Sequence, residues 1–430
     1  MGKSYSNWKE YSFKDFCDIT SSKRIFYREY VKSGIPFYRS KEIIAKSNGK
    51  ELNDCLYISK DRFEEIKNKY GIPINGDILI TAVGTYGIPY LINEDGDFYF
   101  KDGNLIWLKN IKDVADSNFL FYWFKSEEAK NKVEGIIIGS VQKALTIDAM
   151  KNIKINLPPL AEQKCIASIL SALDDKIELN NKTNKILEEM AQTIFKEWFI
   201  NFNFPNEDGK PYKKSGGEMI DSELGKIPKG WKVGTIGDYA KLKSGFAFKN
   251  SWWQNDGIPV IKIQNISSGN LNLEQCSFVS EDKYNIAENF RVNGGDLLIT
   301  LTGSLCKFTI VPKLDKDALV NQRVGKFFLG EEPVKKLPFL YGILNELKDL
   351  IVSLANGSVQ QNISPTDVEN VKIIFPNDKI LNKYNNLMQD IFYKIIFNQK
   401  ENEKLSNIRD SLLPKLMTPK GRRADGEIRV

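Results

Sequence analysis

Apolar residues recur at alternating steps of three and four in two long stretches of the chain, roughly residues 161–200 and 379–417. The first series is Leu170, Leu173, Ile177, Asn180, Asn184, Leu187, Ala191, Ile194 and Trp198. The second series has the same spacing and is Met388, Ile391, Ile395, Asn398, Asn402, Leu405, Arg409, Leu412 and Leu416. This spacing is typical of a coiled-coil seam, so each stretch predicts a long helix that needs a partner helix. We expect the other stretch to supply it.

Asparagine interrupts both seams at the same two places, near the middle of each predicted helix. A repeated polar interruption indicates that these residues fix the register of the helix pair at some cost in stability. A pseudo-twofold axis between the two stretches would make the helices antiparallel. We then expect Asn180 to face Asn402 and Asn184 to face Asn398.

The two stretches belong to a longer internal repeat. Trp8-Lys9 recurs as Trp231-Lys232, and Gly34-Ile35-Pro36 recurs at the same offset as Gly257-Ile258-Pro259. The Gly-Asp-Ile-Leu-Ile-Thr sequence at 76–81 has its counterpart at 295–300, and the Gly-Ser-Val-Gln sequence at 139–142 recurs at 357–360. The offset between counterparts drifts slightly along the chain, which requires only small deletions in loops. We therefore interpret the chain as two homologous halves.

Each half predicts a mixed α/β fold. Short apolar strands, such as 77–82 and 296–301, precede mixed helix and strand, and a last strand (153–157 or 371–375) leads to the long helix. Proline at the end of that strand stops it and opens the helix. Residues 203–230 are rich in Gly, Pro, Lys, Asp and Glu and predict a solvent-exposed connection. We expect the basic tail, 418–430, to be weakly ordered.

Composition limits the class of protein. The 430 residues are 42% hydrophobic and 27% charged, which is typical of globular domains. No apolar run approaches the ~18–20 residues that span a bilayer, and residues 1–6 lack the apolar core of a secretory signal. Five cysteines without a Cys-x-x-Cys pair indicate the reducing cytoplasm.

The chain contains no histidine, which excludes Ser-His-Asp and Cys-His catalysis and histidine-ligated metals. Four-cysteine zinc spacing and the glycine-rich phosphate-binding loops are also absent from the sequence. We therefore predict neither catalytic residues nor metal ligands.

Basic residues concentrate in two windows although the net charge is only +6. Residues 21–50 carry eight basic and two acidic side chains, and residues 241–270 carry four lysines and one aspartate. Two such windows, one in each half, indicate two surfaces that face a polyanion. Solvated loop charge remains an alternative interpretation.

These windows and the loops repeated in both halves supply candidate contacts to a polyanion. On a nucleic acid, Arg and Lys suit guanine, whereas Gln and Asn suit adenine. The family resemblance described below implies that base-specific contacts lie where the halves differ. The candidates are Lys23, Arg24, Arg39 and Lys41 in the first half, and Lys249, Lys262, Gln264 and Asn265 in the second. The repeated Gly-Ser-Val-Gln loops favour phosphate contact or a structural role, and they add Ser140, Gln142, Lys143, Ser358, Gln360 and Gln361. Thr302 and Ser304 are weaker candidates. Trp252-Trp253 could stack on nucleic acid, but core packing is the favoured interpretation.

Several sequences resemble one known family. Pro158-Pro159-Leu160-Ala161-Glu162-Gln163-Lys164-Cys165-Ile166-Ala167 opens the first long helix, and residues 217–231 lead into the second half. Together with the Gly-Ser-Val-Gln pair and Ser411-Leu412-Leu413-Pro414-Lys415-Leu416-Met417, they resemble the DNA-specificity subunits of type I restriction–modification systems over essentially the whole chain. The chain departs from the family at the entry to its second helix, 376–379, and in its tail.

The resemblance implies a definite domain order. Target-recognition domains at 1–157 and 231–376 would each precede a conserved helical spacer, at 158–201 and 377–417, with a linker at 202–230 and a tail at 418–430. The domains would be separated by the pair of long antiparallel helices, and each would read one part of a bipartite sequence in double-stranded DNA while the helices set the spacer.

The resemblance also implies that this chain is non-catalytic and binds no cofactor. Two methyltransferase subunits would carry S-adenosylmethionine, and two restriction subunits, if present, would use ATP and Mg. We expect partner contacts on the outer faces of the helices and on the linker, including Lys182, Lys185 and Glu189. Two alternatives stay open: a self-sufficient DNA-modifying enzyme with an unrecognised site, and a coiled-coil adaptor that binds protein. Missing enzyme motifs argue against the first, and the paired basic windows argue against the second.

Overall fold

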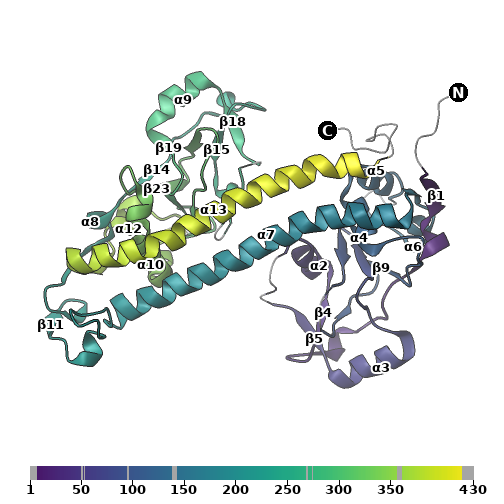
Figure 1. The fold of residues 1–430 in the computed structure, drawn as a ribbon, viewed down its shortest axis with the longest axis horizontal. Coiled ribbons are helices and arrows are strands. Elements are labelled where there is room, and N and C mark those ends of the chain that lie inside the picture. Colours follow the sequence, from purple (N-terminus) through teal and green to yellow (C-terminus); the bar gives the residue numbers. More distant parts are fainter. Residues whose placement is uncertain are drawn as a thin grey trace. The chain divides into compact units, whose positions relative to one another are not determined.

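The computed structural model describes residues 7–49, 52, 54–93, 96–137, 143–267, 270–273, 275–355 and 361–418. The chain divides into two compact units: unit 1 is Met1–Glu178 with Leu405–Val430, and unit 2 is Leu179–Lys404. Each unit therefore contains one mixed α/β domain and a part of both long helices (Figure 1). The predicted fold class and the internal repeat are confirmed.

The domain of unit 1 is built on two four-stranded sheets. The first is antiparallel, in the order β2 (Asp18–Thr20), β9 (Leu105–Lys109), β6 (Ile78–Thr81) and β7 (Pro89–Leu91). The second has the order β3 (Tyr30–Val31), β5 (Leu56–Ile58), β4 (Ile35–Tyr38) and β8 (Tyr99–Phe100), with β4 and β8 parallel. Every residue of β6 is buried, and three of its four residues are Ile or Leu, in agreement with the predicted apolar strand.

Helices cover these sheets and close the core of unit 1. They are α1 (Phe13–Phe16), α2 (Ser40–Ser47), α3 (Lys60–Tyr70), α4 (Ser117–Lys125), α5 (Glu127–Glu134) and α6 (Ile147–Lys151). Phe13 lies with its ring 5.5 Å from Trp123 of α4 and 5.1 Å from Phe16, and all three side chains are buried. The run of five aromatic residues and one leucine at 119–124 in α4 therefore belongs largely to the core, because five of these six side chains are buried.

Unit 2 repeats this architecture. Its sheets have the orders β14 (Lys241–Ser244), β23 (Val324–Phe328), β20 (Leu297–Thr300), β21 (Phe308–Ile310), and β18 (Ser277–Val279), β15 (Ile258–Ile261), β22 (Ala318–Val320), β19 (Arg291–Val292). Its helices are α8 (Ile236–Tyr239), α9 (Glu281–Ala287), α10 (Leu337–Glu346), α11 (Lys348–Ser353) and α12 (Pro365–Glu369), and β16 (Ile266–Ser267) pairs with β17 (Asn270–Leu271). The predicted strands at 77–82 and 296–301 correspond to β6 and β20.

A two-stranded antiparallel ladder ties the start of each domain to the entry of its long helix. In unit 1, β1 (Lys9–Ser12) pairs with β10 (Lys154–Leu157), and in unit 2, β13 (Lys232–Thr235) pairs with β24 (Lys372–Phe375). The helices then follow as α7 (Leu160–Phe195) and α13 (Asp378–Leu416). A π-helical turn over Lys196–Ile200 extends α7. The predicted strand ends and helix starts are confirmed.

The helix segments run antiparallel within each unit. In unit 2, Asn180 Nδ2 donates to Asn402 Oδ1 at 2.9 Å, and Asn398 Nδ2 donates to Asn184 Oδ1 at 2.8 Å. In unit 1, Arg409 Nη1 donates to Asp174 Oδ1 at 2.7 Å. Residue numbers fall along α13 as they rise along α7, which confirms the antiparallel arrangement and both expected asparagine pairs. Their role in fixing the register stays a prediction.

The end of each long helix enters a domain core. Trp198 and Phe199 pack in unit 2 against Tyr384, with Phe199 4.7 Å from its ring, whereas Leu416 and Met417 lie in the core of unit 1. The pairs 198–199 and 416–417 occupy equivalent positions of the repeat. Each helix therefore begins beside its own domain and ends in the core of the unit that contains the other domain.

Most residues of the connection at 203–230 are exposed, as expected, but the segment is also folded. It contains a hairpin of β11 (Met219–Ser222) and β12 (Gly225–Pro228) and contributes a few buried side chains. Phe204 stacks between Tyr212 and Trp231 at ring distances of 4.6 and 4.9 Å. Its few aromatic residues supply enough apolar area to fold the segment against unit 2, although polar residues dominate its composition. Of the tail, residues 419–430 lie outside the described residues.

Candidate nucleic-acid interface

A pocket of about 620 Å³ lies in unit 1, within the basic window of the first half. Three cationic side chains line it, together with three aromatic ones: Arg24, Arg39 and Lys101, and Phe26, Tyr27 and Tyr30. Its wall comes from the segment before β3, the end of β4 and the loop after β8. We call it the arginine pocket. Two predicted DNA contacts, Arg24 and Arg39, thus meet in one cavity.

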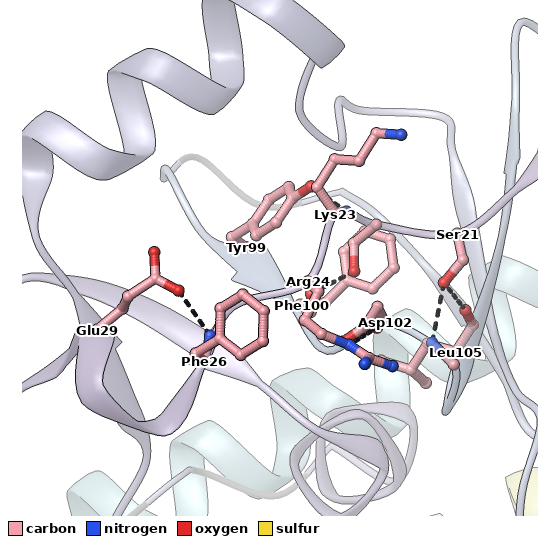
Figure 2. Close-up of polar contacts among 11 residues, drawn as sticks. Ser21, Lys23, Arg24, Phe26, Glu29, Tyr99, Phe100, Asp102 and Leu105 are labelled. Atoms are coloured by element: carbon pink, nitrogen blue, oxygen red, sulfur yellow. Dashed lines mark hydrogen bonds and ion pairs between the residues drawn. The ribbon is translucent and has the colours of Figure 1, made fainter.

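Hydrogen bonds hold the segment that forms one wall of this pocket (Figure 2). Ser22 Oγ donates to the carbonyl of Phe100 at 2.6 Å, and the backbone N–H of Lys23 donates to Tyr99 Oη at 2.7 Å. The backbone N–H of Phe26 donates to Glu29 Oε2 at 2.7 Å, which closes a tight turn. This turn leaves the side chains of Phe26 and Tyr27 52% and 89% exposed.

Each pocket arginine is held by a carboxylate. Arg24 Nε donates to Asp102 Oδ2 at 2.9 Å, while its side chain stays 69% exposed. Arg39 donates to Glu42 twice, from Nη2 at 2.7 Å and from Nε at 3.2 Å, and is 30% exposed. Burial alone would raise the pKa of Glu42, but hydrogen bonds and charge from Arg39 lower it, so the carboxylate stays ionised.

The same local turn exists in unit 2 with different side chains. The backbone N–H of Arg39 donates to Glu42 Oε2 at 2.8 Å, and that of Lys262 donates to Asn265 Oδ1 at the same distance. Lys262 Nζ then donates to Ser277 Oγ at 2.7 Å and lies 3.6 Å from the centre of the Trp253 ring. Burial lowers the pKa of Lys262. The repeat preserves the turn and changes the cationic group it carries.

This comparison corrects one predicted DNA contact. Asn265 is 1% exposed and caps its turn as Glu42 does, so its side chain is not presented to a ligand. Trp252 and Trp253 are partly buried against a core cluster, and Trp252 stacks on Phe246 at 5.9 Å, as the core interpretation predicts. Lys249, 5.7 Å from the centre of the Trp252 ring, and Gln264 are exposed.

The remaining predicted DNA contacts among the described residues do not line the arginine pocket. Lys23 is exposed beside the Tyr70 ring at 4.7 Å, and exposed Lys41 lies 3.4 Å from Glu42 Oε1. Thr302 forms a bridge to Asn362, and the Ser304 carbonyl accepts from Thr300 Oγ1. Lys143 and Gln361 are exposed, whereas the predictions for Ser140, Gln142, Ser358 and Gln360 lie outside the described residues.

Sequence reasoning missed the aromatic wall and one cation of the arginine pocket. Phe26 and Tyr27 lie between Arg24 and Arg28 in the sequence. Such alternation of aromatic and basic residues is typical of nucleic-acid-binding segments, so this part of the wall could have been predicted. Lys101 lies far along the chain and enters the pocket only because β8 pairs with β4.

No group of three or more His, Cys, Asp and Glu residues among the described side chains could hold a metal ion. All five cysteines are free, and burial raises the pKa of both Cys17 and Cys276 to about 12, so neither is a thiolate near neutral pH. No helix in the described part of the chain carries an apolar stretch that could span a lipid bilayer.

Two homologous α/β domains, each leading into one of two antiparallel helices and each bearing basic and aromatic side chains, define a recognition scaffold. The family model described as "Type I restriction modification DNA specificity domain" matches residues 5–189 and 228–407, one match in each half. The chain therefore belongs to the type I restriction–modification DNA specificity family.

Individual relatives agree with this assignment. The chain is 30% identical over 450 residues to the type I restriction enzyme MjaIX specificity subunit of Methanocaldococcus jannaschii, covering 100% of this chain and 95% of that protein. It is 24% identical to the HindI specificity subunit of Haemophilus influenzae, covering 96% and 99%. The crystal structure of the type I system S subunit from M. genitalium shares the fold, with a TM-score of 0.57 at 16% identity over 96% of both chains.

Proposed function

We propose that this chain is the non-catalytic DNA sequence-recognition subunit of a type I restriction–modification complex. The observation that carries the proposal is the family match in both halves, together with relatives along the full length that are named specificity subunits. Free cysteines throughout favour a reducing, cytoplasmic location.

Each domain reads one part of a bipartite target in double-stranded DNA. The repeat supports this division of labour, because the turn that holds Arg39 in unit 1 holds Lys262 in unit 2. Guanidinium and ammonium groups donate hydrogen bonds in different geometries, so two domains with one fold can select different bases. The helices would set the number of base pairs between the two parts.

Two methyltransferase subunits are the proposed partners, with S-adenosylmethionine bound to them. Both long helices leave large apolar side chains exposed at equivalent repeat positions, which are Ile169 and Leu387, Leu179 and Phe397, and Met190 and Ile408. Such side chains are typical of docking surfaces, and their repetition fits two copies of one partner. Restriction subunits that use ATP and Mg would join the complex where they exist. This chain itself would bind no cofactor.

The test compares the purified chain with a complex that contains its methyltransferase. We expect weak DNA binding and no methyl transfer by the chain alone, and tight, sequence-specific methylation by the complex. Sequencing of methylated bases in a host that expresses both proteins would give the target. Methyl transfer by the chain alone, with partner contamination excluded, would contradict the proposal.

A further inference from the structure

We propose that the arginine pocket reads a guanine in the part of the target bound by the first domain. Arg39 would donate to the major-groove edge of the base, and Arg24 would hold the adjacent phosphate. The proposal rests on the proposed function, and it goes beyond that function by assigning one base type to one side chain.

Arg39 has the geometry of a base-reading group. Two hydrogen bonds to Glu42 fix its guanidinium, and Glu42 is itself fixed, because it is 2% exposed and accepts the backbone N–H of Arg39. In the described part of the chain, Nη1 of Arg39 donates to no protein acceptor, and Nη2 has one further hydrogen to offer. A guanidinium positioned in this way loses little conformational freedom when it binds, and it matches the O6 and N7 acceptors of guanine.

Arg24 is suited to a different contact. It lies with 69% of its side chain exposed and is held through Nε alone, at 2.9 Å from Asp102 (Figure 2). Neither of its Nη groups donates to a protein acceptor among the described residues. A loosely held, exposed cation discriminates poorly between bases, whereas it binds the uniform phosphate backbone well. The pocket therefore combines one fixed and one adaptable arginine.

The aromatic wall and the size of the pocket agree with a nucleotide. The pocket has a volume of about 620 Å³. Tyr27, 89% exposed, and Phe26, 52% exposed, can pack against the sugar next to the base whose edge Arg39 reads. Two consecutive exposed aromatic side chains in one short turn, beside two arginines, favour a binding role for this turn.

The second domain provides an internal comparison. Lys262 occupies the position of Arg39, but its ammonium donates to Ser277 and lies over the Trp253 ring. An ammonium also lacks the planar fork that pairs with guanine in two places. We therefore expect the guanine preference set by Arg39 to belong to the first half of the target only.

The experiment maps methylated sites in a host that expresses the methyltransferase with the parent chain or with Arg39→Lys, which keeps the charge but removes the fork. The matched control is Arg62→Lys. Arg62 is 28% exposed and pairs with Glu29 and Glu65, yet it does not line the pocket. Arg24→Ala tests the phosphate contact by the salt dependence of DNA binding to the purified complex.

We expect Arg39→Lys to relax selection at one G·C pair in one half of the target by roughly 10- to 100-fold, with the other half unchanged. Arg62→Lys should keep the parent target. Arg24→Ala should weaken binding to all sequences alike and lower the salt slope by about one ion. An unchanged target for Arg39→Lys, or relaxation at an A·T pair, would overturn the guanine assignment and leave the proposed function standing. Methylation without a defined target in the parent would overturn both.

Discussion

Single residues show how the two halves diverged within one backbone. Asp77 and Asp296 occupy the same repeat position, both are buried, and each accepts a backbone N–H three residues earlier in the chain. Their other partners differ: Asp77 accepts from Trp107 Nε1 at 2.8 Å, whereas Asp296 pairs with Lys326 Nζ at 2.6 Å. Burial raises the pKa of both carboxyl groups. A neutral indole in one half and a charged ammonium in the other thus donate to the same buried carboxyl group of the repeat.

This difference predicts unequal effects of removing the partner. Lys326→Met leaves the Asp296 carboxylate buried without its counter-ion, which should destabilise unit 2 by about 3–5 kcal/mol. Trp107→Phe removes one hydrogen bond from Asp77 and should cost unit 1 about 1–3 kcal/mol. Hydrogen–deuterium exchange in β20 and β6 measures each loss locally.

Lys243→Met is the control for the first variant, because Lys243 is an exposed lysine opposite Lys326 on the neighbouring strand. It should leave exchange in β20 unchanged. Equal protection of β20 in the parent and in Lys326→Met would show that the ion pair does not stabilise the sheet.

At the scale of elements, the asparagine pairs lower the stability of the helix pair. Asn398 is fully buried, and its Oδ1 has no hydrogen-bond partner although its Nδ2 donates to Asn184. An unsatisfied buried acceptor costs about 1–3 kcal/mol. A seam built for stability alone would place leucine here, which supports a register-fixing role for the pair.

We predict that the double variant Asn184→Leu with Asn398→Leu melts at a higher temperature than the parent. Its DNA target should at the same time become less uniform in the number of spacer base pairs, since apolar side chains allow the helices to slip in register. Asn386→Leu, at an exposed position of α13, should change neither property. A lower melting temperature, or a higher one with an unchanged spacer, would count against the register role.

A partly buried acid of α7 predicts a pH dependence. Burial raises the pKa of Glu188 in α7 to about 7 from 4.5, the neighbouring Glu189 adds to the rise, and a hydrogen bond with Tyr341 opposes it. The folded state therefore favours the protonated acid. The stabilisation from Glu188 is fully present below pH 4.5 and is lost as the pH rises towards 7.

Glu188→Gln should remove this loss, because glutamine is neutral at every pH. Between pH 5 and pH 8 the melting temperature should fall less for this variant than for the parent, with the variant more stable at pH 8. Asp390→Asn, at an exposed acid of α13, serves as the control and should follow the parent. Parallel pH profiles for parent and Glu188→Gln would contradict the assignment.

The long helices could be predicted from sequence because their spacing repeats over many residues and in both halves, and no seam residue is exposed in the structure. For the sheets, the sequence predicted individual strands but not which strands pair. Segments of two to five residues, such as Tyr99-Phe100, contain too little pattern to identify their neighbours. For the same reason the sequence predicted only part of the pocket. Arg24 and Arg39 lie in a basic window of the sequence, whereas Lys101 reaches the pocket because β8 pairs with β4.

At the scale of the whole molecule, the repeat allows a test of whether the helices set the number of base pairs between the two parts of the target. Each unit contains antiparallel segments of α7 and α13, so equal insertions in both helices preserve the pairing of their ends. Unequal insertions would break it. The spacer between the two parts of the target can thus be altered without touching any residue proposed to read a base.

We predict that lengthening both helices by four residues adds base pairs to the spacer and leaves both half-sites unchanged. Four residues extend a helix by about 6 Å, and one base pair spans about 3.4 Å, so one or two pairs are expected. Four residues is also a stutter in a heptad seam, and local unwinding should absorb part of the extension and favour one pair. Mapping of methylated sites gives the spacer directly. An unchanged spacer in a folded, active variant would show that the helices do not set the distance, because no other element was altered.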